Sequence, residues 1–331
     1  MPVLVHLRLT VPTDLGSHVC RELVDQPCVT NLTYQQGAVV SPEGDLLECD
    51  VAREQAGQVL DLLEQLGVSD RGSVVVTSPT STPFREARRI EAAAPGHPDD
   101  AVIWDSVESQ AHAGAVPTVS FHLFLLLAVV LAAIAVVTDS AILVIGAMVV
   151  GPEFGAIATV CAAIVLQRWG LFWAGLRLLV LSFTFAIAVT ALLAVVGALT
   201  GLLTLEDVTR ARPNTGFIWH PDRWSFIVAL VAGAAGALAL AIERSSTMVG
   251  VFISVTTVPA AGNLALGLAL LDSGEILGSL AQLGVNVAGM VIAGTLVLLL
   301  VRTSWPWVMA RSESWFSLGK VRPGSGSGGA R

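Results

Sequence analysis

The chain has 331 residues, of which 54% are hydrophobic and only 13% are charged. A soluble globular protein carries roughly twice that charged fraction, so the composition excludes an ordinary soluble protein and predicts an integral membrane protein. The formal net charge of -8 falls mostly on the amino-terminal part and leaves no basic stripe that would bind a nucleic acid.

Residues 3–78 predict six elements in the order strand, helix, strand, strand, helix, strand. Residues 3–11 alternate apolar and polar side chains, as a half-buried strand does, and residues 13–25 change to helical spacing. Two strand-like runs flank the turn at residues 41–44, and Gly67 ends the second helix. This order is typical of the ferredoxin-like split βαβ unit. We therefore expect residues 1–80 to form an α+β domain of the ferredoxin-like type, which serves regulation or dimerisation; binding of a small ligand is the alternative.

The sequence before the first strand shows no secretory signal, because residues 1–13 lack a basic start and a long apolar core. We therefore expect this domain to stay in the cytoplasm. The cysteines have no CxxC or metal-ligand spacing, so we expect reduced packing residues, no metal site and no cofactor. They are Cys20, Cys28, Cys49 and Cys161.

Residues 81–118 are expected to connect this domain to the membrane part through a short helix with Arg85, Arg88 and Arg89. Spanning the bilayer takes about 20 apolar residues in a helix, and six runs qualify. They cover residues 119–137, 141–166, 171–200, 225–242, 247–271 and 276–301, and a tail of residues 302–331 follows.

Arginine and lysine indicate the orientation, because cytoplasmic loops carry an excess of them. With the amino terminus inside, the outer side has three and the inner side has nine. The outer ones are Arg210, Arg212 and Arg223; the inner ones are Arg85, Arg88, Arg89, Arg168, Arg244, Arg302, Arg311, Lys320 and Arg322. We predict a multi-pass protein of the cell (inner or plasma) membrane with both termini in the cytoplasm.

The two halves of the membrane part, residues 119–200 and 225–301, match at an offset of 107 residues. Pro152 then falls on Pro259, Gly155 on Gly262, and the pair Asp139-Ser140 on Ser246-Thr247. Three spans that are repeated once must have opposite orientations in the two copies. We therefore predict a 3+3 inverted repeat, an architecture that recurs in transporters.

The second and fifth spans each carry a proline near the middle. A proline removes one helical hydrogen bond, and irregular backbone in a membrane is tolerated only where it is buried in protein or lines a wet cavity. Helices two and five are therefore predicted to be broken, with small and polar residues around the breaks. The residues predicted to lie on a substrate or ion pathway are Gly151, Pro152, Glu153, Gly155, Thr256, Thr257, Pro259 and Asn263.

Glu153 is the main candidate among these, because an acid at the centre of the bilayer is costly unless it faces protein or water. It is predicted to carry the coupling proton or bind a cation; the alternative is that its carboxylate caps the free amides of the second half-helix. The second copy has Ala260 at the matching place. Its exposed amides, near Thr256, Thr257 and Asn263, would suit an anionic substrate.

Two further polar residues have structural interpretations. Asp139 lies at the boundary between the first two spans, where it is expected to cap the second helix. Asn286 in the sixth span is expected to bridge neighbouring helices.

Two stretches, DSAILVIGAMVVGPEFG and GVFISVTTVPAAGNLALGLAL, behind a small cytoplasmic domain, resemble the domain of unknown function 389 family of bacterial and archaeal membrane proteins. The resemblance covers about residues 119–301. The family usually has two adjacent prolines in the second stretch, whereas this chain has Pro259 followed by Ala260. The resemblance implies a polytopic membrane protein with cytoplasmic accessory domains, and it implies no particular substrate.

Together these patterns predict a secondary transporter or channel-like permease for a small solute, with an anion and proton coupling through Glu153 as the specific hypothesis. The alternative is a membrane-anchored sensor or assembly protein whose soluble domain binds a ligand or partner. An enzyme is not expected, because the chain has no HExxH, GxSxG or paired-acid pattern. The expected partners are the lipid bilayer, the solute and a second copy of the chain.

Overall fold

The computed structural model describes residues 4–94, 96–204, 206, 210–242 and 256–315. Several predicted features lie outside these residues: the first part of the fifth span (247–255, with Ser254), the pair Ser246-Thr247, the pair Glu243-Arg244, and the tail from residue 316. The chain forms two compact units, one up to Trp104 and one over Asp105–Thr303, which are described separately.

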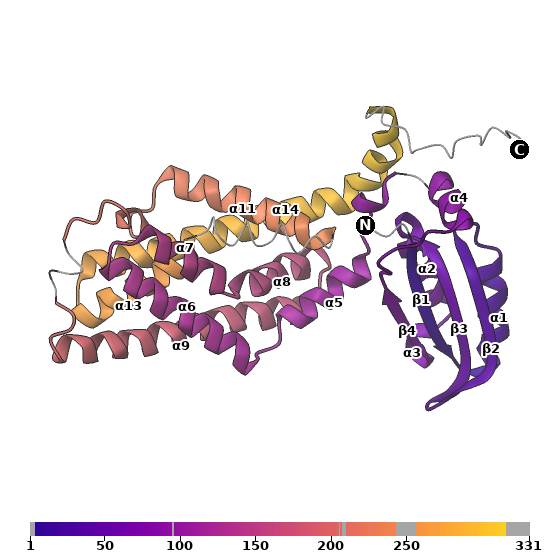
Figure 1. Cartoon of the computed structure of the whole chain (residues 1–331), viewed down its shortest axis with the longest axis horizontal. Helices are drawn as coiled ribbons and strands as arrows, with labels where there is room; N and C mark the ends of the chain where they lie inside the picture. Colours follow the sequence, from indigo (N-terminus) through magenta and orange to yellow (C-terminus); the bar gives the residue numbers. More distant parts are fainter. Residues whose placement is uncertain (1–3, 95, 205, 207–209, 243–255, 316–331) are drawn as a thin grey trace, which may run out of the picture. The chain divides into compact units, whose positions relative to one another are not determined.

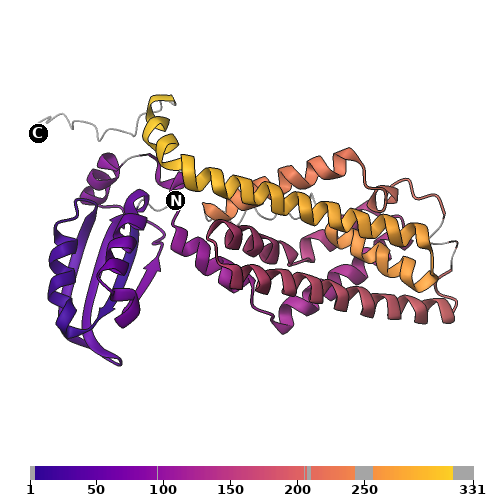
Figure 2. The same ribbon diagram turned by 180° about the vertical axis from the view of Figure 1, so that it is seen from behind.

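The amino-terminal unit is a four-stranded antiparallel sheet with helices against one face (Figures 1 and 2). Its elements follow the predicted order of strands and helices, and the strand order in the sheet is β2-β3-β1-β4. The strands β1 and β2, which flank α1 in the chain, are thus separated by β3, and β3 and β4, which flank α2, are separated by β1. The elements are β1 (Leu4–Val11), α1 (Thr13–Val24), β2 (Val29–Val40), β3 (Glu43–Ala52), η1 (Arg53–Gln55), α2 (Ala56–Gln65), α3 (Val68–Arg71), β4 (Ser73–Thr77), α4 (Arg85–Ala93) and η2 (Pro98–Asp100).

The alternation in β1 decides which face of the sheet is buried. Leu7 and Leu9 are fully buried and pack with Leu23 of α1 and Leu63 of α2, while His6 and Arg8 point to the opposite face. On that face the charges pair across strands. His6 lies 2.9 Å from Asp50 and Arg8 lies 3.7 Å from Glu48.

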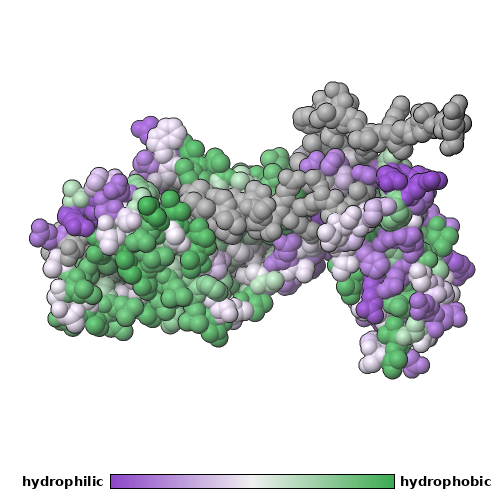
Figure 3. All heavy atoms as spheres, in the orientation of Figure 1, coloured by the Kyte–Doolittle hydropathy of each residue, from purple (hydrophilic) through white to green (hydrophobic). Residues whose placement is uncertain are grey.

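The second unit is a bundle of apolar helices. They are α5 (Trp104–Gly114), α6 (Val119–Val137), α7 (Ala141–Val150), α8 (Glu153–Val165), α9 (Trp169–Leu199), α11 (Arg223–Ala241), α13 (Thr257–Leu270) and α14 (Ser273–Trp315), with the short turn η3 (Gly216–Ile218) before α11. Hydrophobic side chains dominate the visible surface of this unit (Figure 3).

Four of the helices, α6, α9, α11 and α14, are long and apolar enough to cross a membrane. The pair α7 and α8 passes the same test together and bends by 54° at its break. The shorter helix α13 is also apolar, and it carries the described part of the predicted fifth span. The structure therefore has four or five candidate spans among its described residues.

Helix α5 differs from the prediction, since the sequence indicated only a short basic helix in the connector. Val107 and Ala111 of α5 are buried, and the Ala111 carbonyl accepts a hydrogen bond of 2.8 Å from Thr159 in α8. Gly114 lies close to Gly155 and Thr159, where a Cβ atom would not fit. The helix has 11 residues, several of them polar or charged, so its sequence gave no sign of this burial.

The helices of the two halves recur with a constant spacing. Helix α11 begins 104 residues after α6 (223 and 119), α13 begins 104 residues after α8 (257 and 153), and α14 begins 104 residues after α9 (273 and 169). The offset of 107 taken from the prolines differs because Pro152 precedes its helix, whereas Pro259 is the third residue of α13.

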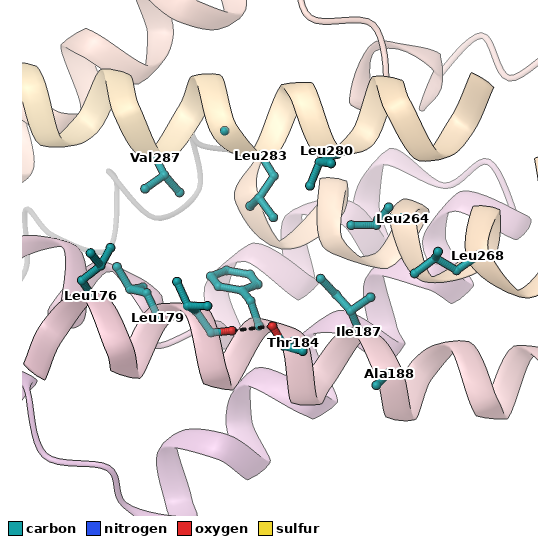
Figure 4. A pocket seen from close by; sticks show the side chains of 13 residues that line it. Leu176, Leu179, Thr184, Ile187, Ala188, Leu264, Leu268, Leu280, Leu283 and Val287 are labelled. Carbon is teal, nitrogen blue, oxygen red and sulfur yellow. Dashed lines mark hydrogen bonds between the residues drawn. The ribbon is translucent and has the colours of Figure 1, made fainter. Parts of the chain in front are cut away.

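The third helices of the two halves, α9 and α14, are antiparallel. Along an apolar cavity between them, residue numbers rise along α9 and fall along α14 in the same direction (Figure 4). Helix α13 forms the third side of this cavity, which has a volume of about 520 Å³. The Thr184 hydroxyl on its wall donates a 2.7 Å hydrogen bond to the Val180 carbonyl, so the lining is apolar.

Two glycines give a matched test of this packing. A Cβ atom on Gly262 of α13 would lie 2.7 Å from both Ala132 Cβ and Ala133 N of α6, whereas one on Gly155 of α8 would meet nothing within 4 Å. Gly262→Ala should destabilise the protein by about 1–3 kcal/mol through overpacking. Gly155→Ala should be neutral or slightly stabilising. Thermal unfolding in detergent compares the two; equal midpoints for both variants would contradict the packing of α6 on α13.

Thiol reactivity tests the core of the amino-terminal unit. Burial raises the pKa of the Cys49 thiol to about 12, and Cys28 and Cys161 are buried as well, while Cys20 is half-buried. Because the thiolate is the reactive form, a thiol reagent at pH 8 should modify Cys20 first and all four cysteines only after denaturation. Modification of Cys49 in the folded protein at the rate of Cys20 would show that this core is not formed.

Candidate functional site

The break between α7 and α8 lies at Gly151 and Pro152. Helix α7 ends at Val150, and Pro152 is the residue that precedes the first turn of α8. Proline has no N–H to donate, so it fits before a helix, where the first amides have no partner in any case. The break predicted for the second span is therefore present, and it makes Glu153 the first residue of a new helix.

The Glu153 side chain is buried, with only 6% of its surface exposed. Its Oε1 atom accepts a hydrogen bond of 2.8 Å from the Thr257 hydroxyl, while Oε2 has no hydrogen-bond partner among the described residues. Oε2 fills the place where a side chain on Gly151 would begin, next to Val258. Only glycine at position 151 therefore leaves room for the carboxylate.

Helix α13 begins in the same way as α8. Thr256 precedes it, Thr257 is its first residue, and Pro259 lies in the first turn, where a missing N–H costs no helical hydrogen bond. The first residues of the two helices, Glu153 and Thr257, are the ones that bond to each other. Two helix amino termini thus meet at a single carboxylate, and both favour a negative charge there.

The two half-helices run in opposite directions from this meeting point. The end of α13 packs at Gly267 against Glu275 in the first turn of α14, while Arg302, near the other end of α14, donates to the Val165 carbonyl at the end of α8. Glu275 and Arg302 are about 40 Å apart along α14 at 1.5 Å per residue. Helices α8 and α13 therefore lie head to head beside one continuous helix.

A polar face of α14 lies along α13. Glu275, Ser279, Gln282 and Asn286 recur at spacings of four, three and four residues, so they share one side of the helix. All four are buried. They extend over about 16 Å, which is roughly half of the hydrocarbon thickness of a bilayer.

At one end of this polar face, Gln282 and Asn286 bind Thr256, the residue before α13. Thr256 accepts hydrogen bonds of 3.0 Å from Gln282 and 2.8 Å from Asn286. The Oε1 atom of Gln282 is buried without a partner in the described structure. Asn286 bridges two helices, as predicted from the sequence.

The other end of the polar face, at the start of α14, contains a buried ion pair. Arg212 donates to Glu275 Oε1, and its other nitrogen donates to Asn263 Oδ1 at 2.8 Å. The Asn263 amide nitrogen donates to Glu275 Oε2 at 2.6 Å and to Ser279 at 2.8 Å. Only 2% of the Arg212 side chain and 5% of the Glu275 side chain are exposed.

Arg212 comes from the connection between the two halves, and that connection is fixed to the first half. Asp139 accepts from the Thr215 hydroxyl at 2.8 Å and from Asn214, and Arg210 donates to the Val137 carbonyl at 2.6 Å. Partial burial acts to raise the pKa of Asp139, but the hydrogen bonds from Thr215 and Asn214 outweigh it and hold the pKa below its ordinary value.

The expected role of Asp139 as a helix cap is corrected by this geometry. Ser140 caps α7, since its hydroxyl accepts from the Leu143 amide. Asp139 has a left-handed backbone conformation, with a φ of 49°, and its carboxylate faces the connection. The left-handed backbone at Asp139 places Ser140, and not Asp139, at the capping position.

The structure brings together some of the predicted pathway residues and separates others. Gly151, Pro152, Glu153 and Thr257 lie at the meeting point, whereas Thr256 and Asn263 bind α14 through different partners. Gly155 lines a small cavity of about 240 Å³ beside α5. Asn263 has no free hydrogen-bonding group left for an anion in this state.

Four residues of the polar cluster were missed at the sequence level: Arg212, Glu275, Ser279 and Gln282. Three of them could have been found from their spacing with Asn286 in the sixth span. Arg212 carried no such signal, because a loop arginine is ordinarily solvated. Among the described residues, no group of three or more His, Cys, Asp or Glu side chains is placed to hold a metal ion.

The comparisons with known proteins agree with the resemblance read from the broken-helix motifs. Residues 148–292 match the family model described as Domain of unknown function (DUF389). No curated protein and no solved structure matches the chain. The matched range begins just before Gly151 and ends in α14, so it contains both half-helices and the polar face of α14. The family predicted from the sequence is confirmed: residues 148–292 are a domain of the DUF389 family.

Proposed function

We propose that the protein is a multi-pass membrane permease that moves a small anionic solute together with a proton carried by Glu153. The observation that supports this most directly is the single buried carboxylate between two helix amino termini. A mere membrane anchor does not need such a group at the centre of its bundle, where burial of an acid is costly.

We infer that the bundle is an inverted repeat of three plus three spans. The constant offset of 104 residues and the antiparallel course of α9 and α14 support this inference. Each half-helix also packs on helices of the other half, since Phe154 fits against Gly236 of α11 and Gly262 against Ala132 of α6. In such transporters the repeats rock against each other around a central site.

The arginine distribution supports cytoplasmic termini in the cell membrane. Arg168 and Arg302 lie at one end of the bundle, near the end of α8, whereas Arg212 lies at the other end, at the start of α14. For the amino-terminal unit we infer a ferredoxin-like fold, supported by the strand order β2-β3-β1-β4. Its sheet face with paired charges of both signs is proposed to regulate the permease or to pair with a second copy.

The coupling follows from electrostatics at the start of α13. While Glu153 is ionised, its carboxylate occupies the place that an anion would take beside Thr257. When Glu153 takes up a proton, the negative charge leaves and the free amides of both half-helices can receive the solute. Proton and anion then bind together, so the loaded site carries no additional net charge into the apolar interior, where burial of a charge is costly.

Glu153→Gln tests the proton role directly. Glutamine resembles protonated Glu153, so the anion can still bind, but the side chain can no longer take up or release a proton. We therefore expect anion uptake by proteoliposomes to lose its dependence on the pH gradient and to fall to the level measured without a gradient. Glu206→Gln, in the exposed connection, is the control and should leave uptake unchanged. Unchanged, gradient-driven uptake in Glu153→Gln would remove Glu153 from the mechanism.

Thr257 offers a second test, because among the described residues its hydroxyl is the one side-chain group that donates to the Glu153 carboxylate. Thr257→Val keeps the shape but deletes the donor, so it should destabilise the closed bundle by about 1–3 kcal/mol and lower uptake. Thr257→Ser keeps the hydroxyl and should behave like the wild type. If valine and serine variants behave alike in both assays, the hydrogen bond has no role in transport.

The competing function is a membrane-anchored sensor or assembly protein. A panel of anions, amino acids and cations in proteoliposomes separates the two. Uptake of any of these solutes supports a permease. No flux with any member of the panel, together with saturable binding of a ligand to the full-length protein that charge reversal at Arg8 or Glu48 abolishes, would support the sensor instead.

A further inference from the structure

The Arg212 cluster holds a carboxylate in the way that a binding site would. Glu275 receives Arg212 on one oxygen and the Asn263 amide on the other, and Ser279 completes the set of polar groups around Asn263. A guanidinium and an amide nitrogen are donors only, so they present a planar set that matches a carboxylate group. Any small carboxylate of similar geometry would meet the same donors.

The position of this cluster adds to the argument. It lies at the start of α14, about 16 Å along the polar face from Asn286, which reaches Thr256 beside the meeting point of the half-helices. Two resident carboxylates, Glu275 and Glu153, thus lie at the two ends of a continuous series of buried polar side chains. Each lies where positive groups favour an anion.

The energetics indicate a site that can exchange its occupant. A buried ion pair gains little net stability over apolar packing, although breaking one partner is strongly unfavourable because the other charge is left buried and unpaired. An incoming anion that replaces Glu275 on Arg212 leaves no charge unpaired, provided that Glu275 reaches water. Glu275 lies in the first turn of α14 at the end of the bundle, next to the exposed residues Ser273 and Gly274, so this movement is short.

We propose that Arg212 and Asn263 form a carboxylate-binding site at the outer end of the pathway, which Glu275 occupies in the closed state and a small carboxylate solute occupies when the path opens. This inference rests on the proposed function for its biological meaning, since it names the substrate class. The binding itself does not require transport. Asp139 and Arg210 fix the connection that carries Arg212 to the first half. A movement of the first half relative to α14 would therefore carry Arg212 away from Glu275.

Chemical rescue tests the site. Glu275→Ala removes the resident carboxylate and leaves Arg212 unpaired in a cavity that formate or acetate can fill. We expect acetate to raise the thermal unfolding midpoint of this variant saturably, by about 3 °C or more, because a ligand that binds only the folded state stabilises it. Chloride at equal ionic strength is the control for screening, and the double variant Arg212→Met/Glu275→Ala, which lacks the charge that holds the anion, should show no response.

One further variant and the wild type keep the test decisive. If Glu275→Ala does not fold, Glu275→Gln keeps the shape of the side chain without its charge and should show the same acetate response. The wild type should respond with a half-saturating acetate concentration at least about tenfold higher, because acetate must first displace Glu275. A wild type with no saturable response, or a single variant that acetate stabilises no more than chloride does, overturns the proposal. Rescue by acetate without uptake of any solute would support the binding site and contradict the permease. Uptake without rescue would support the permease and contradict the binding site.

Discussion

The hydrogen bond between Thr257 and Glu153 is the interaction on which the arrangement of the bundle depends. A helix that begins in the middle of a membrane leaves its first amides without partners, and hydrocarbon offers no water to replace them. Here two such helices begin at the same place, so both sets of amides face a shared interior and not lipid. One carboxylate lies between them and is favoured by the positive ends of both helices.

This geometry explains why the two halves of the sequence are not equivalent. Glu153 and Thr257 are the first residues of α8 and α13, which begin 104 residues apart, and these two side chains bind each other. A second acid at position 257 would place two negative charges side by side in a medium of low dielectric constant. A single acid with a hydroxyl donor opposite is therefore the stable solution, and α13 needs no acid at its start.

Much of the fold follows from local signals that can be identified in the sequence. The first span is predicted over residues 119–137, and α6 covers these residues, because Thr118 caps it and polar residues follow it. Pro152 predicts the break in the second span, and Gly67, with a φ of 73°, follows the end of α2. Caps, prolines and glycines act within a few residues, so a single sequence is enough to locate them.

The rest depends on contacts between distant parts of the chain. Helix α5 has no apolar run that the sequence could reveal, and its burial depends on Thr159 and Gly155 of α8. Arg212 lies in a polar loop and becomes a buried residue only because Asn263 and Glu275 supply its partners. The prolines are 107 residues apart whereas the helix starts are 104 apart, because a proline is tolerated both before a helix and in its first turn.

The same contacts describe which parts can move. Glu153 is enclosed by Gly151 and Val258, and Arg212 is buried at the far end of the polar face. On the opposite side, a cavity beside α5 reaches Gly155, two residues from Glu153. The half-helices pack on helices of the other half, so separating the halves would break the tight apolar contact of Gly262 with Ala132 as well as the hydrogen bond between Thr257 and Glu153.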